Sequence, residues 1–348
     1  MSKCNGMGIN AAESKDDLST KQKLSDAELP IFFLQLGAKT SLFFDRILKQ
    51  AVLSNGTENV FILTDTNFEQ YSNFNCIDIS GYANRERIFD KVYKHHSTNP
   101  YFFEKTCFDR WFIINELIKE HAIENFMYAD CDVLILEDIK PVFNNFIKDY
   151  YDGTMMFFAE GENSITSAHT SFWNSKLLNS FCDFVIAKYT DEQQLSTIVT
   201  DAAAGKFFDN KNVSDMILLD VFRTETLPAT LPLLSLEGIG MGFDFNINAS
   251  FNGYKHYFAC TAYTRIKKLI QRRDGLYGLV KDDVKSPASV KFYTLHFQGY
   301  LTKALIPVYG NYSKGVERFK NNITGYYNFL LRRGKLAKNA VKRSFRKF

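Results

Sequence analysis

Two carboxylates, Asp130 and Asp132, stand one residue apart in the apolar stretch NFMYADCDVLIL, residues 125–136. Side chains two apart on a β-strand point to the same face, so we expect both carboxylates to reach one ligand while Cys131 faces away. If the strand ends at the pair, a tight turn would also let the two carboxylates converge. A buried carboxylate is costly unless it is paired or bound to a metal. Two hard oxygen donors suit Mn²⁺ or Mg²⁺, which proteins commonly hold with one or two carboxylates and the phosphates of a substrate. The pair therefore predicts a divalent-metal site. So short a pattern arises by chance about once in a chain of this length, so the surrounding sequence must decide whether the pair binds a metal.

Short strands and helices alternate ahead of the pair and must position it. Apolar residues at strand and helix spacing predict strands at 29–37, 59–65 and 125–136 and helices at 41–56 and 104–121. This alternation predicts an α/β domain with a mixed, mostly parallel central sheet flanked by helices, a Rossmann-like architecture. Ligands of such sheets bind beyond the carboxyl ends of the strands, so we expect Thr64 and Asp65 to lie near the acid pair.

The second half of the chain is less regular. We expect strands at 154–160 and 170–173, helices at 174–189 and 212–223, and a late strand within 290–299 that ends on His296. The whole is predicted to form a single catalytic domain over residues 29–310. A polar, disordered N-terminal tail, residues 1–28, precedes this domain, and a basic amphipathic helical tail, residues 311–348, follows it.

The order of these motifs resembles the GT-A-fold, D-x-D-containing nucleotide-sugar glycosyltransferases. The similar segments are IFFLQLG, a strand ending in LTD, a helix carrying Arg110, YADCDVLIL, and LHFQGYLTK near the end. The last segment is similar to the H-F-x-G…K segment of the galactosyltransferase/glycogenin type, with its Lys one residue further from the Gly. The resemblance implies Mn²⁺ or Mg²⁺ on Asp130, Asp132 and His296, and phosphate contacts from Gly299 and Lys303.

The resemblance also implies the remaining contacts to the donor and the acceptor. Further donor-binding residues would be Gln35, Gly37, Thr64, Asp65, Arg110 and Tyr128. From its position on the helix before the acid strand, Arg110 could also pair with an Asp and hold its side chain in place; the alternative is an ordinary surface Arg. The segment VSDMILL occupies the place where retaining members have an Asp-Gln pair, and here Met216 replaces the amide. Asp215 is then the catalytic candidate, as a base for an inverting reaction or as a residue that positions the acceptor. Weaker candidates for acceptor binding are Glu160, Glu162, His169 and Asp244.

Two other functions remain open. A haloacid-dehalogenase-like phosphatase would use Asp130 as nucleophile, and KDDVK at 281–285 imitates its later acidic motif. That family opens its domain with the nucleophile strand, whereas here two strand-helix units precede it, and 281–285 is typical of a solvated loop. The third possibility is a catalytically silent sugar-nucleotide-binding protein.

Charge and cysteine patterns bear on partners and location. Eight cations and no acid lie after Leu331, interspersed with apolar residues: Arg332, Arg333, Lys335, Lys338, Lys342, Arg343, Arg346 and Lys347. Such a helix suits an anionic membrane surface and a lipid-linked acceptor, whereas the rest of the chain has more acids than bases and favours no nucleic-acid partner. The six scattered cysteines and the polar N-terminus, without a secretory signal, are typical of a cytoplasmic protein, which the tail would attach peripherally to the inner membrane face.

Overall fold

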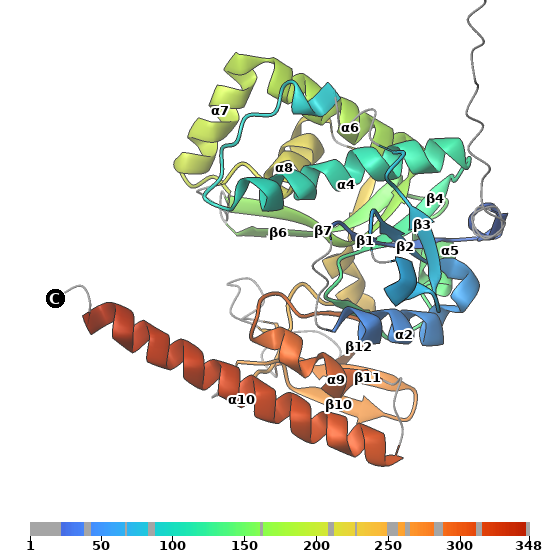
Figure 1. Ribbon diagram of the computed structural model, residues 1–348, viewed down its shortest axis with the longest axis vertical. Coiled ribbons are helices and arrows are strands. Elements are labelled where there is room, and N and C mark those ends of the chain that lie inside the picture. The colour runs from blue at the N-terminus through green and yellow to red at the C-terminus, as the bar shows by residue number, and fades with distance from the viewer. Residues whose placement is uncertain are drawn as a thin grey trace, which may run out of the picture.

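The computed structural model describes residues 22–37, 43–66, 68–82, 88–160, 163–207, 212–226, 228–248, 257–261, 265–281, 288–310 and 315–345. Figure 1 shows a large sheet with helices packed above it in this view, and a smaller sheet with a long helix below it. The candidate site lies where the chain passes from the first sheet to the second.

Seven strands form the first sheet, in the order β3-β2-β1-β4-β7-β6-β8. Their bounds are β1 (Ile31–Gln35), β2 (Val60–Thr64), β3 (Asn75–Asp78), β4 (Asn125–Ala129), β6 (Gly153–Glu160), β7 (Asn163–Asn174) and β8 (Thr230–Pro232). The four strands from β3 to β4 run parallel, β7 runs antiparallel to β4 and β6, and β8 is parallel to β6. The predicted mixed α/β class with a mostly parallel central sheet is confirmed.

The residues of β1 show how this sheet is covered on both faces. All five are buried. Ile31 and Phe33 belong to the hydrophobic core that includes α2, and Phe32 and Leu34 to the core that includes α4. Continuous apolar strands of this kind are typical of parallel sheets with helices on both sides.

The helices divide between these two cores. Helices α4 (Tyr101–Glu120), α6 (Ser175–Thr190), α7 (Glu192–Ala203) and α8 (Asp215–Thr226) lie together on one side of the sheet, and α2 (Phe44–Asn55) lies on the other (Figure 1). The short α5 (Lys140–Phe146) adds Val142 and Phe143 to the core on the α2 side. The four predicted helices are all present, each with bounds that differ by a few residues.

A second sheet runs in the order β10-β11-β12-β5, and β9 also pairs with β12. Its strands are β5 (Val133–Ile135), β9 (Met241–Phe243), β10 (Leu269–Arg272), β11 (Gly275–Leu279) and β12 (Ser289–His296). Because β12 is antiparallel to β5, with His296 opposite Val133, the end of β12 lies beside the turn that leads into β5.

The prediction of one continuous strand over residues 125–136 is wrong. β4 ends at Ala129, and the N–H of Asp130 makes a last bond to the His169 carbonyl. Val133 N then donates to the Asp130 carbonyl at 2.9 Å, which closes a tight turn before β5 enters the other sheet. The two carboxylates therefore converge through a turn that links two sheets, and strand alternation does not explain their direction.

Both predicted tails have parts that pack on the domain. Residues 22–26 form a helical turn, and Leu24 is buried in the core on the α4 side. The helix α10 (Gly315–Phe345) runs beside α9 (Ile306–Tyr309) and buries Phe329, and Arg46 donates to Asn321 at 3.2 Å. Short 3₁₀ helices lie at Thr57–Asn59, Phe68–Tyr71, Leu233–Ile239 and Thr302–Leu305. Among the described residues, no helix combines the length and the apolar character needed to cross a bilayer.

Candidate active site

Asp130, Asp132 and His296 form a cluster of potential metal ligands. One ligand atom from each of the three lies within 4.8 Å of the others, and no other group of three His, Cys, Asp or Glu side chains meets this condition in the described part of the chain. The two acids come from the turn between β4 and β5, and His296 is the last residue of β12. The N–H of Phe297 donates to the Asp132 carbonyl at 3.0 Å, which ties the end of β12 to the turn.

The His296 ring directs one particular nitrogen toward the acids. Its Nδ1 donates to the Phe245 carbonyl at 2.6 Å, and its Nε2 lies 3.4 Å from Asp132 Oδ1. A backbone carbonyl that accepts from one ring nitrogen fixes the tautomer and leaves the other nitrogen as the ligand atom. Two carboxylates and an imidazole of fixed tautomer fit Mn²⁺ or Mg²⁺ in chemical type.

Burial and mutual contact shift the pKa values of this pair in opposite directions. Burial alone would raise the pKa of Asp132, but His296 and Lys303 outweigh burial and hold this pKa below its ordinary value. Burial alone would lower the pKa of His296, but the Asp132 carboxylate outweighs burial and raises it. Each shift favours the charged form of its residue, so a metal ion on this pair would compete with a proton for Nε2 of His296.

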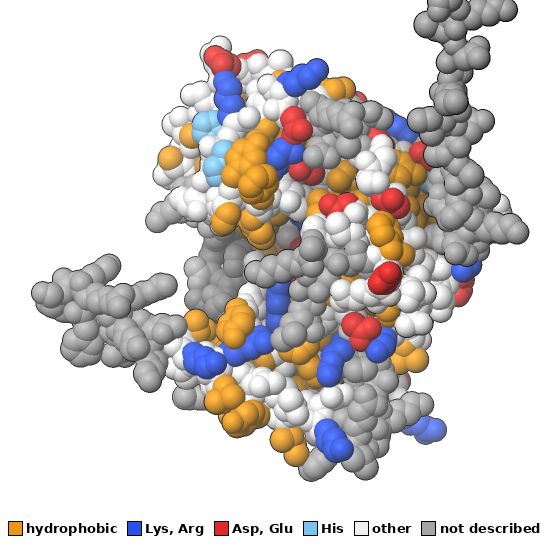
Figure 2. All heavy atoms as spheres, viewed as in Figure 1, with side chains coloured by type: hydrophobic (Ala, Val, Ile, Leu, Met, Phe, Trp, Pro, Cys, Tyr) orange, Lys and Arg blue, Asp and Glu red, His pale blue; other side chains and the backbone are white. Residues whose placement is uncertain are grey.

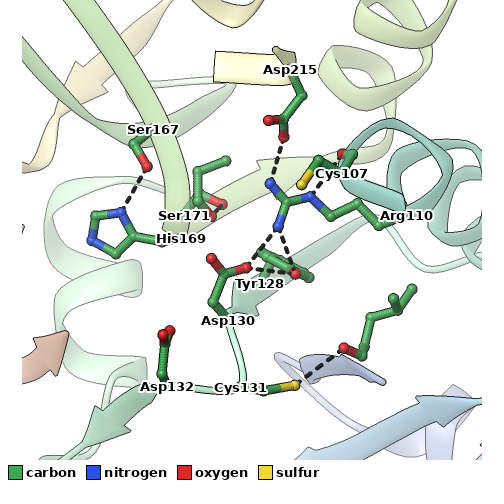
Figure 3. A network of polar contacts seen from close by, with 12 residues as sticks. Cys107, Arg110, Tyr128, Asp130, Cys131, Asp132, Ser167, His169, Ser171 and Asp215 are labelled. Carbon is green, nitrogen blue, oxygen red and sulfur yellow. Dashed lines mark hydrogen bonds and ion pairs between the residues drawn. The ribbon is translucent and has the colours of Figure 1, made fainter. Parts of the chain in front are cut away.

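Arg110, on α4, links the acid turn to α8, as Figure 3 shows. Its Nη1 donates to Asp130 Oδ1 at 2.7 Å, and its Nη2 donates to Asp215 Oδ2 at 2.5 Å. Tyr128 also donates to Asp130 Oδ1, at 2.8 Å, and Trp111 Nε1 donates to Asp215 Oδ2 at 3.0 Å. Two donors thus hold one oxygen of Asp130 in place. A carboxylate oxygen of Asp130 still lies within 4.8 Å of the ligand atoms of Asp132 and His296.

A cavity of about 580 Å³ opens in front of the cluster. It brings eight of the predicted site residues together in its lining, namely Arg110, Tyr128, Asp130, Asp132, Asp215, His296, Gly299 and Lys303. Lys303 Nζ lies 3.0 Å from Asp132 Oδ2, so its positive charge stands beside the metal cluster. Gly299 has a φ of 87°, and a Cβ added there would meet no heavy atom within 4 Å, so the backbone is bare at this point of the cavity wall.

Four predicted donor-binding residues lie at the sheet edge outside this lining. Gln35 is the last residue of β1, and Gly37 follows two residues later. Thr64 is the last residue of β2, and Asp65 follows it. The N–H of Gly37 donates to Asp65 Oδ1 at 2.8 Å, which joins the two strand ends. Leu34, also on β1, lines the cavity, so the carboxyl end of β1 is next to the cavity.

Two of the weaker candidates for acceptor binding, Asp244 and His169, are buried and make contacts within the protein. Asp244 is fully buried in an ion pair with Lys267, so it does not contact an acceptor. His169 lines the cavity, but Ser167 and the Asp244 carbonyl occupy its two ring nitrogens. Burial and the neighbouring His296 lower the pKa of His169 well below its ordinary value, so its ring is neutral.

Some predicted positions fall at or beyond the limit of the described structure. Glu160 ends β6, and its side chain is not described. Glu162 lies outside the described residues, as do Asp282 and Asp283 of the acidic segment considered for a phosphatase.

Several residues of the site carry no signal in the sequence. Trp111, which donates to Asp215, was not among the predicted site residues, and neither were Phe103 and Asn99, which line the cavity. Lys267 lies in a segment with no recognisable motif, yet it is fully buried behind His296. Only their contacts across the fold identify these residues.

Comparison with known proteins finds similarity among solved structures. No protein-family model matches the sequence, and no match to a curated protein is found. Among solved structures, the apo form of mouse xyloside xylosyltransferase 1 is similar at a TM-score of 0.43 and 9% identity, over 68% of this chain and 96% of that chain. PaToxG glycosyltransferase is similar at 0.35 and 12%, over 61% and 76%. The galactosyltransferase LgtC, in complex with donor and acceptor sugar analogues, is similar at 0.34 and 12%, over 55% and 69%.

All three of these solved structures are glycosyltransferases. All three TM-scores lie below 0.5 and all three identities below 25%. The chemistry of this chain must therefore be inferred from its own site.

Proposed function

We propose that this protein is a metal-dependent glycosyltransferase that moves a sugar from a nucleotide-diphosphate sugar, a UDP-sugar first among them, to a glycan acceptor. The observation that carries the proposal is the convergence of Asp130, Asp132 and His296 in one cavity. Lys303 lines the same cavity and pairs with Asp132, so the site combines a metal-ligand set with a nearby cation, a combination that suits a diphosphate.

Each residue of the cluster has a task in such a reaction. A divalent cation on the three ligands would bind the diphosphate and stabilise the negative charge that develops on the leaving nucleotide. Lys303 adds a positive charge on the same side, from its place 3.0 Å from Asp132. Gly299 allows a phosphate oxygen to approach the backbone closely, because no side chain covers it. Arg110 keeps Asp130 aimed at the cation through their 2.7 Å ion pair.

We assign Asp215 a positioning role at the reacting end of the donor. Its Oδ2 accepts from both Arg110 and Trp111, and its side chain is almost fully buried. Both bonds use the same oxygen, so Oδ2 of Asp215 is already engaged by two donors of the protein. Asp215 therefore serves this reaction by anchoring Arg110, in place of the catalytic-base role that the sequence suggested.

The nucleoside of the donor belongs at the carboxyl ends of β1 and β2. Gln35, Gly37, Thr64 and Asp65 lie at this edge, next to the cavity that Leu34 lines. Sheets of this type bind nucleotides at this edge. A donor that spans from Asp65 to His296 would place its diphosphate at the metal cluster and its base against these strand ends.

The acceptor is expected to enter at the outer rim of the cavity, where α4 begins. Phe103 lines the cavity and is 59% exposed, and Tyr101 and Phe102 are exposed beside it. Figure 2 shows a hydrophobic patch in this part of the molecule, next to histidine side chains. Exposed aromatic rings offer flat apolar faces suited to the apolar faces of sugar rings. This rim supports a glycan as the acceptor.

A lipid-linked glycan is the form of acceptor that α10 favours. Ile323, Tyr327, Leu330 and Leu331 are exposed on this helix. The cations that begin at Arg332 follow in the sequence. Exposed apolar side chains beside cations suit contact with an anionic membrane surface, which would bring such acceptors to the enzyme.

The geometry of Asp130 disfavours the phosphatase alternative. Its Oδ1 accepts from Arg110 and Tyr128, so the carboxylate is restrained on one side. His296 has no part in an attack by Asp130 on phosphorus, whereas it completes a metal-ligand set. A silent binder would share this geometry, so only turnover separates it from an enzyme.

Nucleotide release from sugar nucleotides tests the proposal. The full-length protein is incubated with UDP-glucose, UDP-galactose, UDP-N-acetylglucosamine or GDP-mannose, in Mn²⁺ or in EDTA, and free nucleotide is measured. We expect slow transfer to water from at least one donor in Mn²⁺ and none in EDTA, because charge on the leaving nucleotide needs the cation. Phosphate release from sugar phosphates without any nucleotide release would establish the phosphatase instead. Nucleotide binding without release from any donor would establish the silent binder.

A further inference from the structure

A fully buried ion pair lies behind His296. Asp244 directly follows β9, and Lys267 lies two residues before β10. Both side chains are 0% exposed. Lys267 Nζ donates to Asp244 Oδ1 and, at 2.8 Å, to the Asn246 carbonyl. A buried ion pair seldom adds net stability over apolar residues of the same volume, so its presence calls for another role.

Asp244 contacts the end of β12 and the ring stacked on His296. Its Oδ2 accepts from the backbone N–H of His296 at 3.0 Å, and its own N–H donates to the Thr294 carbonyl at 3.2 Å. Its carbonyl accepts from His169 Nε2 at 3.1 Å. The His169 and His296 rings are stacked, with centroids 4.0 Å apart. Asp244 thus holds both the backbone of His296 and the ring that covers its face.

The residues after Asp244 complete the enclosure of His296. The Phe245 carbonyl accepts from Nδ1 of the imidazole, and the N–H of Ile247 donates to the His296 carbonyl at 2.9 Å. Lys267 holds this same segment from behind, because its N–H donates to the Ile247 carbonyl at 3.1 Å and its Nζ to the Asn246 carbonyl. The segment 244–247 therefore lies between Lys267 and His296.

We propose that the Asp244–Lys267 pair is a positioning device for the metal site. The pair fixes segment 244–247, and this segment fixes the tautomer of His296 and the direction of its Nε2. Neither Asp244 nor Lys267 is among the described residues that line the cavity, so both act through His296 and not on a ligand. The proposal rests on the metal site proposed above.

Mn²⁺ affinity and the tautomer of His296 test this role together. In full-length protein, Mn²⁺ binding is titrated by electron paramagnetic resonance, and the imidazole nitrogens are observed by NMR of ¹⁵N-histidine-labelled protein without metal. Lys267→Met is expected to weaken Mn²⁺ binding about 10- to 100-fold, the usual effect of losing a residue that orients a metal ligand. At a pH high enough for the imidazole to be neutral, the wild type should show one His296 tautomer, with the proton on Nδ1, and the variant a mixture.

Two further variants separate positioning from stability. Lys267→Met leaves the Asp244 carboxylate buried without its partner, and this stranded charge alone could unfold the protein. The double variant Asp244→Asn/Lys267→Met buries no charge, so it tests the positioning role in a folded protein. The double variant should still bind Mn²⁺ about tenfold more weakly than the wild type, because the Asn246 carbonyl has lost its donor. Asp220→Asn is the matched control. Asp220 is an equally buried acid on α8 that accepts from Thr166 and Arg223, and its replacement should lower thermal stability without changing Mn²⁺ affinity.

The outcomes distinguish this proposal from the metal site itself. Wild-type Mn²⁺ affinity and a single tautomer in the folded double variant would overturn the positioning role and leave the metal site intact. Absence of Mn²⁺ binding in the wild type would overturn the metal site, and the NMR measurement would still decide whether the pair controls His296.

Discussion

In the Asp132→Asn variant, Mn²⁺ binding is expected to weaken at least about 100-fold, and Mn²⁺-dependent nucleotide release is expected to disappear. The amide keeps an oxygen of the same size but loses the charge that faces both His296 and Lys303. The low pKa of Asp132 means that its carboxylate stabilises the folded state at neutral pH, so the melting temperature should also fall without metal. Mn²⁺ titration and thermal unfolding measure the two effects.

An exposed acid supplies the control for this substitution. Asp149, after α5, is exposed. Asp149→Asn removes the same charge and should leave Mn²⁺ binding and nucleotide release unchanged. If Asp132→Asn bound Mn²⁺ as tightly as the wild type, the cluster of Asp130, Asp132 and His296 would not be the metal site.

Replacing Arg110 by Met is expected to lower the free energy of unfolding by about 3–5 kcal/mol, the usual cost of removing one partner of a buried ion pair. Arg110 is buried and bonds to Asp130 and Asp215 at once. Burial alone would lower the pKa of Arg110, but Asp215 and Asp130 outweigh burial and raise it well above its ordinary value. The variant leaves Asp215 buried with Trp111 as the remaining donor to its Oδ2. Urea denaturation measures the loss.

The double variant Arg110→Met/Asp215→Asn identifies the cause of this loss. It removes both charges, so it should be more stable than Arg110→Met alone, because no unpaired carboxylate stays buried. Equal stability of the single and double variants would mean that the lost energy comes from packing of the Arg side chain and not from the stranded charge of Asp215.

The parts of the fold that follow from local patterns could be predicted from the sequence. The helix that carries Arg110 and the late strand that ends on His296 each have apolar residues at a regular spacing, and both are present. The β4–β5 break could not be predicted, because apolar residues flank it on both sides and only pairing with β12 shows that the chain has changed sheets. A turn whose partners lie more than a hundred residues away leaves no local signal.

The site likewise contains residues that could be predicted from local motifs and pairs of residues that could not. Asp130, Asp132 and His296 belong to motifs with fixed spacing, which made them candidates from the sequence alone. The contact of Arg110 with Asp215 joins helices α4 and α8, and that of Asp244 with Lys267 joins two loops of the second sheet. Such pairings depend on how distant elements pack, and one sequence gives no means to choose among the possible partners.

Anomalous diffraction from crystals grown with Mn²⁺ and UDP tests the metal site most directly. We predict a single strong manganese peak within about 2.0–2.3 Å of a carboxylate oxygen of Asp130, a carboxylate oxygen of Asp132 and Nε2 of His296, with diphosphate oxygens completing the coordination. Manganese bound elsewhere, or UDP bound in the cavity with no metal at these three residues, would contradict the proposed function.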